Sequence, residues 1–197
     1  MASRRSWLVA LVALVLLAGG AAAAYALLAG APAATTPAGA WAAVAYALGN
    51  GQPERVHDHL DAAGQDACAA IARDAARAVE LVDAHYPEAE RARVRAPYAE
   101  AARAGGPSAV WLLRATSRGW LDTLRADLSG VAAVEADGAR AIVTTARGSR
   151  HELARRPDGG WGLTAFSAEL ARERERLGRD LVLIERAAAD YARSGPP

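Results

Sequence analysis

The chain has 197 residues, of which 52% are hydrophobic and 23% are charged. This length suits one domain, and the composition excludes an intrinsically disordered chain. The single cysteine excludes an intramolecular disulfide framework and a zinc site built from several thiolates. The net charge is only +1, and no basic stripe stands out, so we expect no nucleic-acid partner.

The N-terminal region has the pattern of a membrane segment. No charged side chain occurs between Arg5 and Glu54, and residues 7–29 form an apolar run. Its length is close to the roughly 20 residues that cross a bilayer as a helix. Arg4 and Arg5 precede the run, and such cationic residues stay in the cytoplasm. The sequence therefore predicts a cytoplasmic tail at 1–6 and a single-pass protein of the inner membrane with its C-terminal domain outside the cytoplasm.

A cleaved signal peptide is the alternative, and it would leave a secreted or periplasmic protein. Such a peptide needs a basic start, a short apolar run and a cleavage site between small residues. Ala29-Gly30-Ala31 and Ala31-Pro32-Ala33 are sites of this kind, but the long apolar run favours a retained anchor. Residues 3–8 also resemble the twin-arginine export signal. Every one of these interpretations places the rest of the chain outside the cytoplasm.

Residues 30–37 are predicted to form a linker, and residues 38–197 are predicted to form a single exported domain. We expect short helices up to Leu48 and over 53–60, and a longer helix over 65–86. The buried stripe of the longer helix is predicted to comprise Cys68, Ile71, Ala75, Val79, Val82 and Tyr86. Cys68 is therefore expected to be a small buried thiol.

The middle of the chain continues as helices. Residues 88–104 are rich in Arg and Glu and are predicted to be helical with a break at Pro97. Gly105-Gly106-Pro107 ends this part, and an amphipathic helix is expected over 108–129. Its apolar face is predicted to comprise Val110, Leu113, Ser117, Leu121, Leu124 and Leu128, with Trp111 and Trp120 on its flanks.

The hydrophobic period then changes from that of a helix to that of strands. We expect strands over 131–136, 139–146, 150–156 and 161–166, with a type I′ turn at Asp137-Gly138. The short connections predict a four-stranded antiparallel meander. A long C-terminal helix should follow, with Ser167 as its cap. Its apolar stripe is predicted to comprise Leu177, Leu181, Ile184, Ala188 and Tyr191. The fold class expected is α+β: a transmembrane helix, helices on the meander, and a long last helix.

Three segments resemble the nuclear-transport-factor-two-like superfamily, also called the cystatin-like cone. They are ALGNG at 47–51, DGARAIV at 137–143 and DGGW at 158–161. The resemblance extends over 38–166 and implies helices folded over a curved antiparallel sheet that can enclose a pocket. The superfamily includes isomerases, dehydratases, ligand carriers and pure scaffolds, so the resemblance alone does not select a function.

His151 is the first candidate for chemistry. On the third predicted strand it alternates with Glu152 and shares a face with Leu153, so we expect it to point inward. An inward histidine can act as a base near neutral pH. A hydrogen-bonded structural histidine is the simpler interpretation, because the sequence shows no carboxylate beside it.

The weaker candidates could line a ligand pocket, and they are Trp111, Trp120 and Trp161. Core packing is the commoner role of tryptophans on amphipathic elements. His57 and His59 diverge on a helix, so we expect surface histidines and no metal site there. The chain has no phosphate-binding glycine loop and no Gly-x-Ser-x-Gly motif, and no cofactor is expected.

These observations favour a membrane-anchored, non-catalytic domain that binds a protein partner or an apolar ligand in the cell envelope. The C-terminal helix is a possible surface for a protein partner or for self-association. The alternative is a small cone-fold enzyme or ligand carrier with a pocket around His151. A pocket that holds His151 beside a carboxylate would favour this alternative, and an interior filled with Trp and Leu would favour the scaffold.

Overall fold

The computed structural model describes residues 32–194. The unit Ala33–Pro197 is compact and contains every element described below. The predicted tail at 1–6, with Arg4 and Arg5, and the predicted membrane segment at 7–29 lie outside the described residues. Within 32–194, no helix combines the length and the apolar character that a bilayer crossing requires.

The first half of the domain is helical, as predicted. Helix α2 spans Pro37–Gly49, the 3₁₀ helix η1 spans Pro53–His59, and helix α3 spans Ala62–His85. Thr36 caps α2 as expected, because its hydroxyl accepts a hydrogen bond of 3.0 Å from the Gly39 N–H. Asp61 caps α3 in the same way at the Gly64 N–H, so this helix begins three residues earlier than predicted.

The segment after α3 forms four short helices. They are α4 at Glu88–Arg95, α5 at Ala99–Arg103, α6 at Pro107–Ser117 and α7 at Trp120–Ala126. The prediction of one helix over 108–129 was wrong, because Gly119 adopts a left-handed conformation with φ 70° and breaks it in two. The break also changes the buried face. Helix α6 buries Val110, Trp111 and Ala115, and α7 buries Leu121 and Leu124.

The four strands form the predicted antiparallel meander in the order β1-β2-β3-β4. They span Val131–Asp137, Arg140–Thr145, Arg150–Arg155 and Trp161–Leu163. The first turn differs from the prediction, because Asp137 pairs with Arg140 and the loop residues are Gly138 and Ala139. Of these two loop residues, only Gly138 has a positive φ, with a value of 58°. A type I′ turn needs positive φ at both loop residues and is therefore excluded.

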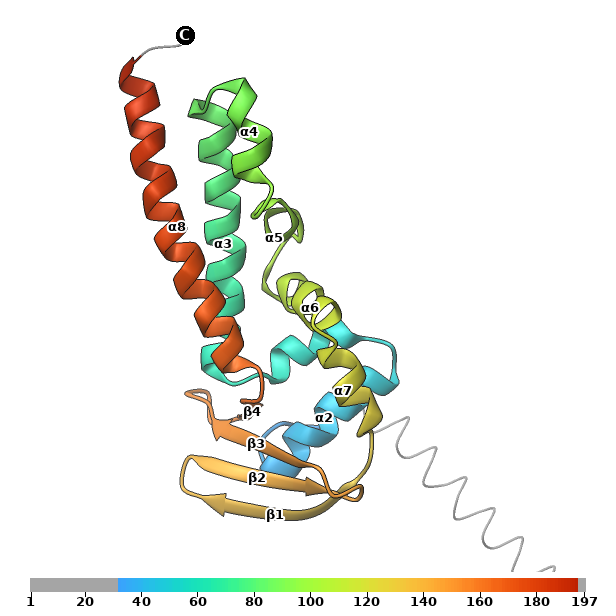
Figure 1. Ribbon diagram of the computed structural model, residues 1–197. Helices are drawn as coiled ribbons and strands as arrows, with labels where there is room; N and C mark the ends of the chain where they lie inside the picture. The colour runs from blue at the N-terminus through green and yellow to red at the C-terminus, as the bar shows by residue number, and fades with distance from the viewer. Residues whose placement is uncertain (1–31, 195–197) are drawn as a thin grey trace, which may run out of the picture. The chain divides into compact units, whose positions relative to one another are not determined.

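The last helix, α8, spans Ser167–Ser194 and lies beside α3 (Figure 1). The two helices run parallel: the Ser167 hydroxyl donates to Asp61 Oδ1 at one end, and the Tyr86 and Tyr191 rings lie 5.0 Å apart near the other. The predicted stripe of α8 faces inward, with Leu177, Ile184 and Ala188 buried. The domain is thus α+β, with a four-stranded antiparallel sheet and a long C-terminal helix.

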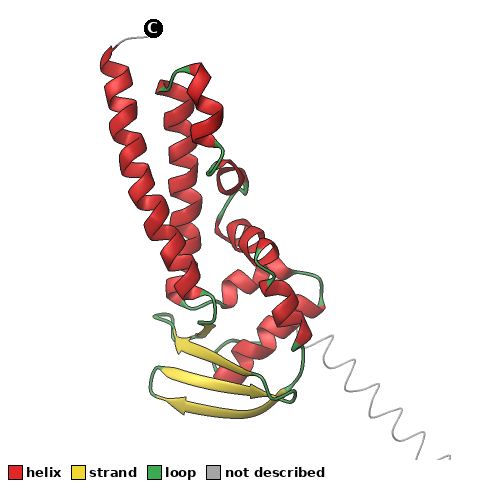
Figure 2. Cartoon of the chain, viewed as in Figure 1, coloured by secondary structure: helices red, strands yellow, loops and turns green. Residues whose placement is uncertain are grey.

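Two hydrophobic clusters divide this domain. The larger one, called the base below, joins the sheet to α2, η1, α6, α7 and the first turns of α3 and α8. The smaller one, called the arm, lies between the far ends of α3 and α8 and is formed by helices only (Figure 2). Its buried members are Ala78, Leu81, Val82, Tyr86, Ile184 and Ala188.

Candidate functional site

His151 points into the base, as strand alternation predicted. It lies on β3 opposite Val143 of β2, and both Val143 and the neighbouring Leu153 are buried. The His151 side chain is itself only 12% exposed. The ring therefore occupies the inner face of the sheet.

A buried carboxylate is the partner of His151. The Asp127 Oδ2 atom lies 2.6 Å from His151 Nε2, and the Thr145 hydroxyl donates to Asp127 Oδ1 at 2.9 Å. Burial alone raises the pKa of Asp127. Hydrogen bonds from His151, Thr145 and Ser149 outweigh burial, and the pKa lies below its ordinary value. Asp127 is therefore ionised near neutral pH.

The ionised state of Asp127 fixes the tautomer of neutral His151. A carboxylate only accepts hydrogen bonds, so Nε2 of His151 must carry the proton that faces Asp127. The other nitrogen, Nδ1, is then the basic atom of the ring. This is the orientation that a carboxylate gives to a histidine that acts as a general base.

Trp41 of α2 covers the same histidine. Its indole ring stacks on the His151 ring with centroids 3.8 Å apart and an interplanar angle of 16°. The Trp41 Nε1–H donates to the Ser129 carbonyl at 3.1 Å, which fixes the indole next to the loop that carries Asp127. One face of the imidazole is thus closed by a rigid aromatic side chain.

Sequence reasoning missed both neighbours of His151. Asp127 lay inside the expected helix 108–129, where it read as a polar residue, whereas it follows the real end of α7 as its C-cap. Trp41 follows Ala40 in an alanine-rich helix, and no periodic pattern marked it. The sequence did contain one usable signal. His151 occupies an inward position of a strand, and Asp127 is the single acidic residue between α7 and β1.

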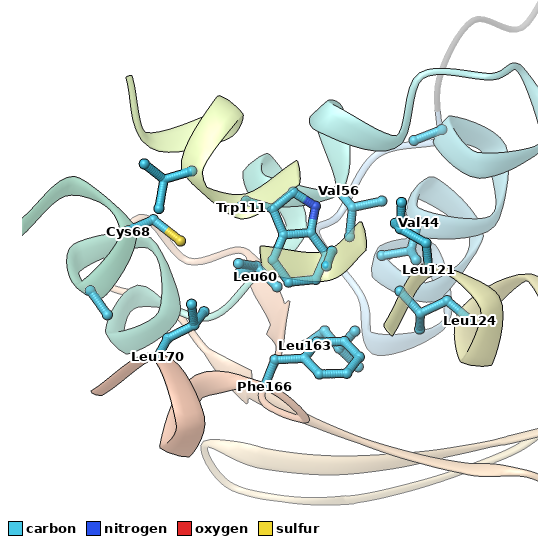
Figure 3. Packing of buried hydrophobic residues seen from close by; sticks show 14 of the residues in the cluster. Val44, Val56, Leu60, Cys68, Trp111, Leu121, Leu124, Leu163, Phe166 and Leu170 are labelled. Atoms are coloured by element: carbon cyan, nitrogen blue, oxygen red, sulfur yellow. The ribbon is translucent and has the colours of Figure 1, made fainter. Parts of the chain in front are cut away.

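The three tryptophans proposed for a pocket do not line one together. Trp111 is fully buried, and its ring lies 5.8 Å from Trp120 and 5.4 Å from Phe166. Its Nε1–H donates to the Pro53 carbonyl at 3.1 Å. Figure 3 shows Trp111 in the middle of the base, with Leu60, Leu163 and Phe166 around it. Trp161 lies elsewhere, at the start of β4, where its backbone N–H donates to the Ala34 carbonyl.

A second buried carboxylate connects α6 to α8. Glu173 is buried and accepts from Arg114 at 2.6 Å and from Arg118. The Arg118 guanidinium lies 5.1 Å from the centroid of the Trp120 ring. Cys68 is buried nearby, as predicted. Burial and the Glu173 charge raise the pKa of its thiol to about 12, so it is inert as a nucleophile.

The prediction that His57 and His59 are surface side chains was wrong. They lie on η1, which packs between α2 and α6, and both are partly buried. His57 Nε2 and His59 Nδ1 are buried without a hydrogen-bond partner. Burial lowers the pKa of His59, so its neutral form is favoured. Among residues 32–194, no group of three or more His, Cys, Asp or Glu side chains is arranged to hold a metal ion.

Two apolar grooves lie along the short helices. One has a volume of about 540 Å³ between α3, α4 and α5, with Val79 and Ala99 in its lining and Glu80 and Arg95 as charged members. The other has a volume of about 460 Å³ between α5 and α6 and includes Leu112 and Leu113. Arg103 lines both. The grooves are therefore neighbours that meet at α5.

Comparisons with protein-family models, with curated proteins and with solved structures found no match. The resemblance to the nuclear-transport-factor-two-like superfamily therefore stays a prediction that depends on the three sequence segments.

Proposed function

We propose that this chain is a non-catalytic envelope protein that binds a protein partner outside the cytoplasmic membrane. The observation that carries the proposal is the filled interior of the base. Trp41, Trp111 and Phe166 occupy the space between the sheet and the helices, where a cone-like fold would otherwise enclose a ligand. An interior packed with aromatic rings favours a scaffold over an enzyme or an apolar-ligand carrier.

The grooves beside α5 are the proposed binding surface. Their linings are mainly Ala, Val and Leu, with Glu80, Arg95, Glu100 and Arg103 among the charged members. An apolar floor with charges of both signs suits the apolar face of a partner helix, as in helix-in-groove recognition. The predicted stripe of α8 is less suitable, because it already packs against α3. A partner on α8 would instead meet Val182 and Leu183, which are 54% and 62% exposed.

Photo-cross-linking in cells that express the full chain tests the binding surface. A photoreactive residue at Leu113 or at Val79 should give cross-links to one distinct protein. The same residue at Ala139, in the exposed first turn of the sheet, is the matched control and should give no cross-link to that protein. Leu113→Glu should remove the cross-link from Val79, and Ala139→Glu should leave it intact. Equal products from all three positions would contradict a specific groove.

Native mass spectrometry tests the claim of a filled interior. The purified chain should have the mass of the polypeptide alone, because Trp41, Trp111 and Phe166 fill the middle of the base. A co-purifying ligand that survives extraction in detergent would show that the protein is a ligand carrier.

The location in the membrane is part of the same proposal and has its own test. Arg4 and Arg5 before the apolar run 7–29 support an N-terminus in the cytoplasm and a retained anchor. A reporter fused after Pro197 should be active only outside the cytoplasm, and the chain should fractionate with membranes. Intact-mass analysis then separates the anchor from a signal peptide, because cleavage would remove about the first 30 residues.

A second candidate function, acid–base catalysis, is favoured by one observation. Asp127 orients His151 so that Nδ1 is its basic atom, with the Nε2 to Oδ2 distance at 2.6 Å. A substrate of this pair would have to reach Nδ1 of a ring whose one face Trp41 closes. Trp41→Ala would then expose the ring and change ligand binding. In the scaffold proposal, the same variant only lowers stability.

A further inference from the structure

The rest of the domain covers one edge of the sheet and leaves the other edge open. The β4 edge is covered, because Leu60 forms a parallel bridge with Leu163 and the Trp161 N–H donates to Ala34. The β1 edge ends the strand order, and none of the described residues pairs with its outer side. All of β1 except its first residue is exposed. An open edge of this kind is a template for another strand.

The hairpin geometry shows which backbone groups of β1 are free. Asp137 and Arg140 close a two-residue loop, so they form a hydrogen-bonded pair. The alternation of an antiparallel ladder makes Glu135 and Ile142 the next such pair. Val134 and Ala136 therefore direct their N–H and C=O groups away from β2. Ala132 is the extra residue at an irregularity between Val131 and Ala133, and the strand is regular from Ala133 onward.

We propose that β1 pairs with β1 of a second copy of this chain, antiparallel, with Val134 opposite Val134 of the other copy. The free N–H and C=O groups of the two Val134 residues then satisfy each other across a two-fold axis. The pairing joins two four-stranded sheets into one of eight strands. It is isologous, so it closes after two copies.

The side chains favour this register over its neighbour. With Val134 on the axis, each Glu135 lies opposite Ala133 of the other copy. A shift that placed Glu135 on the axis would oppose two carboxylates, which is destabilising. Each Glu135 also lies 3.3 Å from Arg150 of its own copy, which compensates its charge on the outer face.

The proposed pairing would also bury apolar surface at Val134. Val134 is 42% exposed although it shares the inner face of the sheet with the fully buried Val143. A second copy would cover it with an identical valine, and β-branched pairs of this kind stabilise antiparallel strands. The contact spans only the regular part of one short strand, so we expect a weak, reversible dimer.

Disulfide trapping in the full chain tests the register directly. Val134→Cys places a thiol on the two-fold axis, and mild oxidation should convert most of the chain to a covalent dimer. Glu135→Cys is the matched control, because its neighbour in the other copy is Ala133, and it should stay largely monomeric. The native Cys68 does not interfere, because it is buried and its thiol is inert. A dimer from Glu135→Cys at least as abundant as that from Val134→Cys would overturn the proposal.

Co-purification of two differently tagged full-length copies tests the pairing without oxidation. The wild-type copies should co-purify. Val134→Pro removes a free N–H that the β1–β2 ladder does not use, so the variant should fold and lose most of the co-purification. Val134→Arg, which places like charges across the axis, should do the same and replaces the proline variant if that one unfolds. Wild-type copies that do not associate, or full association of Val134→Arg, would overturn the proposal.

Discussion

The base and the arm of this domain differ in how they are held together. The base buries two tryptophans completely, together with many Leu and Val side chains, and it satisfies Asp127 and Glu173 with hydrogen bonds and ion pairs. The arm relies on one seam between α3 and α8, in which small side chains such as Ala78 and Ala188 limit the buried area. Because stabilisation follows buried apolar area, we expect the base to set the stability of the domain and the arm to open locally.

This contrast also separates the proposed roles. The self-pairing edge β1 belongs to the rigid base, and one proposed groove lies beside α4 at the start of the arm. Elements that bind partners are often drawn from the less stable part of a fold. Substitutions in the two regions should therefore have effects of different size and different extent.

The largest effect is expected in the base, from Trp111→Ala. The change removes a fully buried ring and leaves the Pro53 carbonyl without its donor, at a cost of about 3–5 kcal/mol. Urea denaturation of the full chain, followed by circular dichroism, measures this loss. Trp120→Ala, at a half-buried position of the same aromatic cluster, is the control and should cost clearly less. Equal losses would contradict the central position of Trp111.

In the arm, Ile184→Ala should cost about 2 kcal/mol, the lower end of the usual range, because the seam is narrow and near solvent. The loss should be local. Hydrogen exchange should accelerate in 78–95 and 184–194, while amides of β2 and β3 keep their protection. Leu183→Ala, on the exposed side of the same helix, is the matched control and should change neither region. Acceleration across the sheet would show that the two clusters unfold as one.

The Asp127–His151 pair predicts a dependence on pH. The pKa of Asp127 is lower in the folded state than its ordinary value of 3.8, so its carboxylate stabilises the fold above that pH. This contribution is lost as the pH falls through the folded-state pKa. The free energy of unfolding should therefore drop more steeply in acid for the wild type than for Asp127→Asn, and the gap between them should narrow below about pH 4. A constant gap from pH 7 to pH 3 would contradict this assignment.

The smallest expected effect concerns Cys68. Its thiol is buried and has a pKa of about 12, so a thiol reagent at pH 8 should not label the native chain. The same reagent should label one cysteine per chain after denaturation in urea. Rapid labelling of the native protein would mean that the start of α3 opens far more often than the base allows.

The sequence predicted the order of the elements better than the contacts between them. Periodicity and turn residues located α2, α3, the four strands and α8, because each depends on local pattern. The break between α6 and α7 was not predicted. A glycine within a helical pattern is usually tolerated, and only the φ of 70° at Gly119 shows that it ends a helix here. The inward direction of His151 followed from strand alternation, a local rule.

The partners of His151 did not follow from any local rule. Trp41 lies 110 positions away in the chain, and Asp127 lies 24 positions away in a segment expected to be helical. Such contacts depend on how α2 packs on the sheet, which sequence spacing does not encode. Similarly, the sequence places Glu173 among several charged residues of a helix face expected to be solvated. Only the packing of α6 on α8 buries it in an ion pair with Arg114.

Native-state hydrogen exchange of the unmodified full chain tests the contrast between base and arm most directly. We predict that amides of β2, β3 and the first turns of α3 exchange only through global unfolding. Amides near Tyr86 in α3 and near Tyr191 in α8 should exchange through a local opening of lower free energy that depends little on denaturant. Identical opening free energies in both regions, with the same denaturant dependence, would contradict the account.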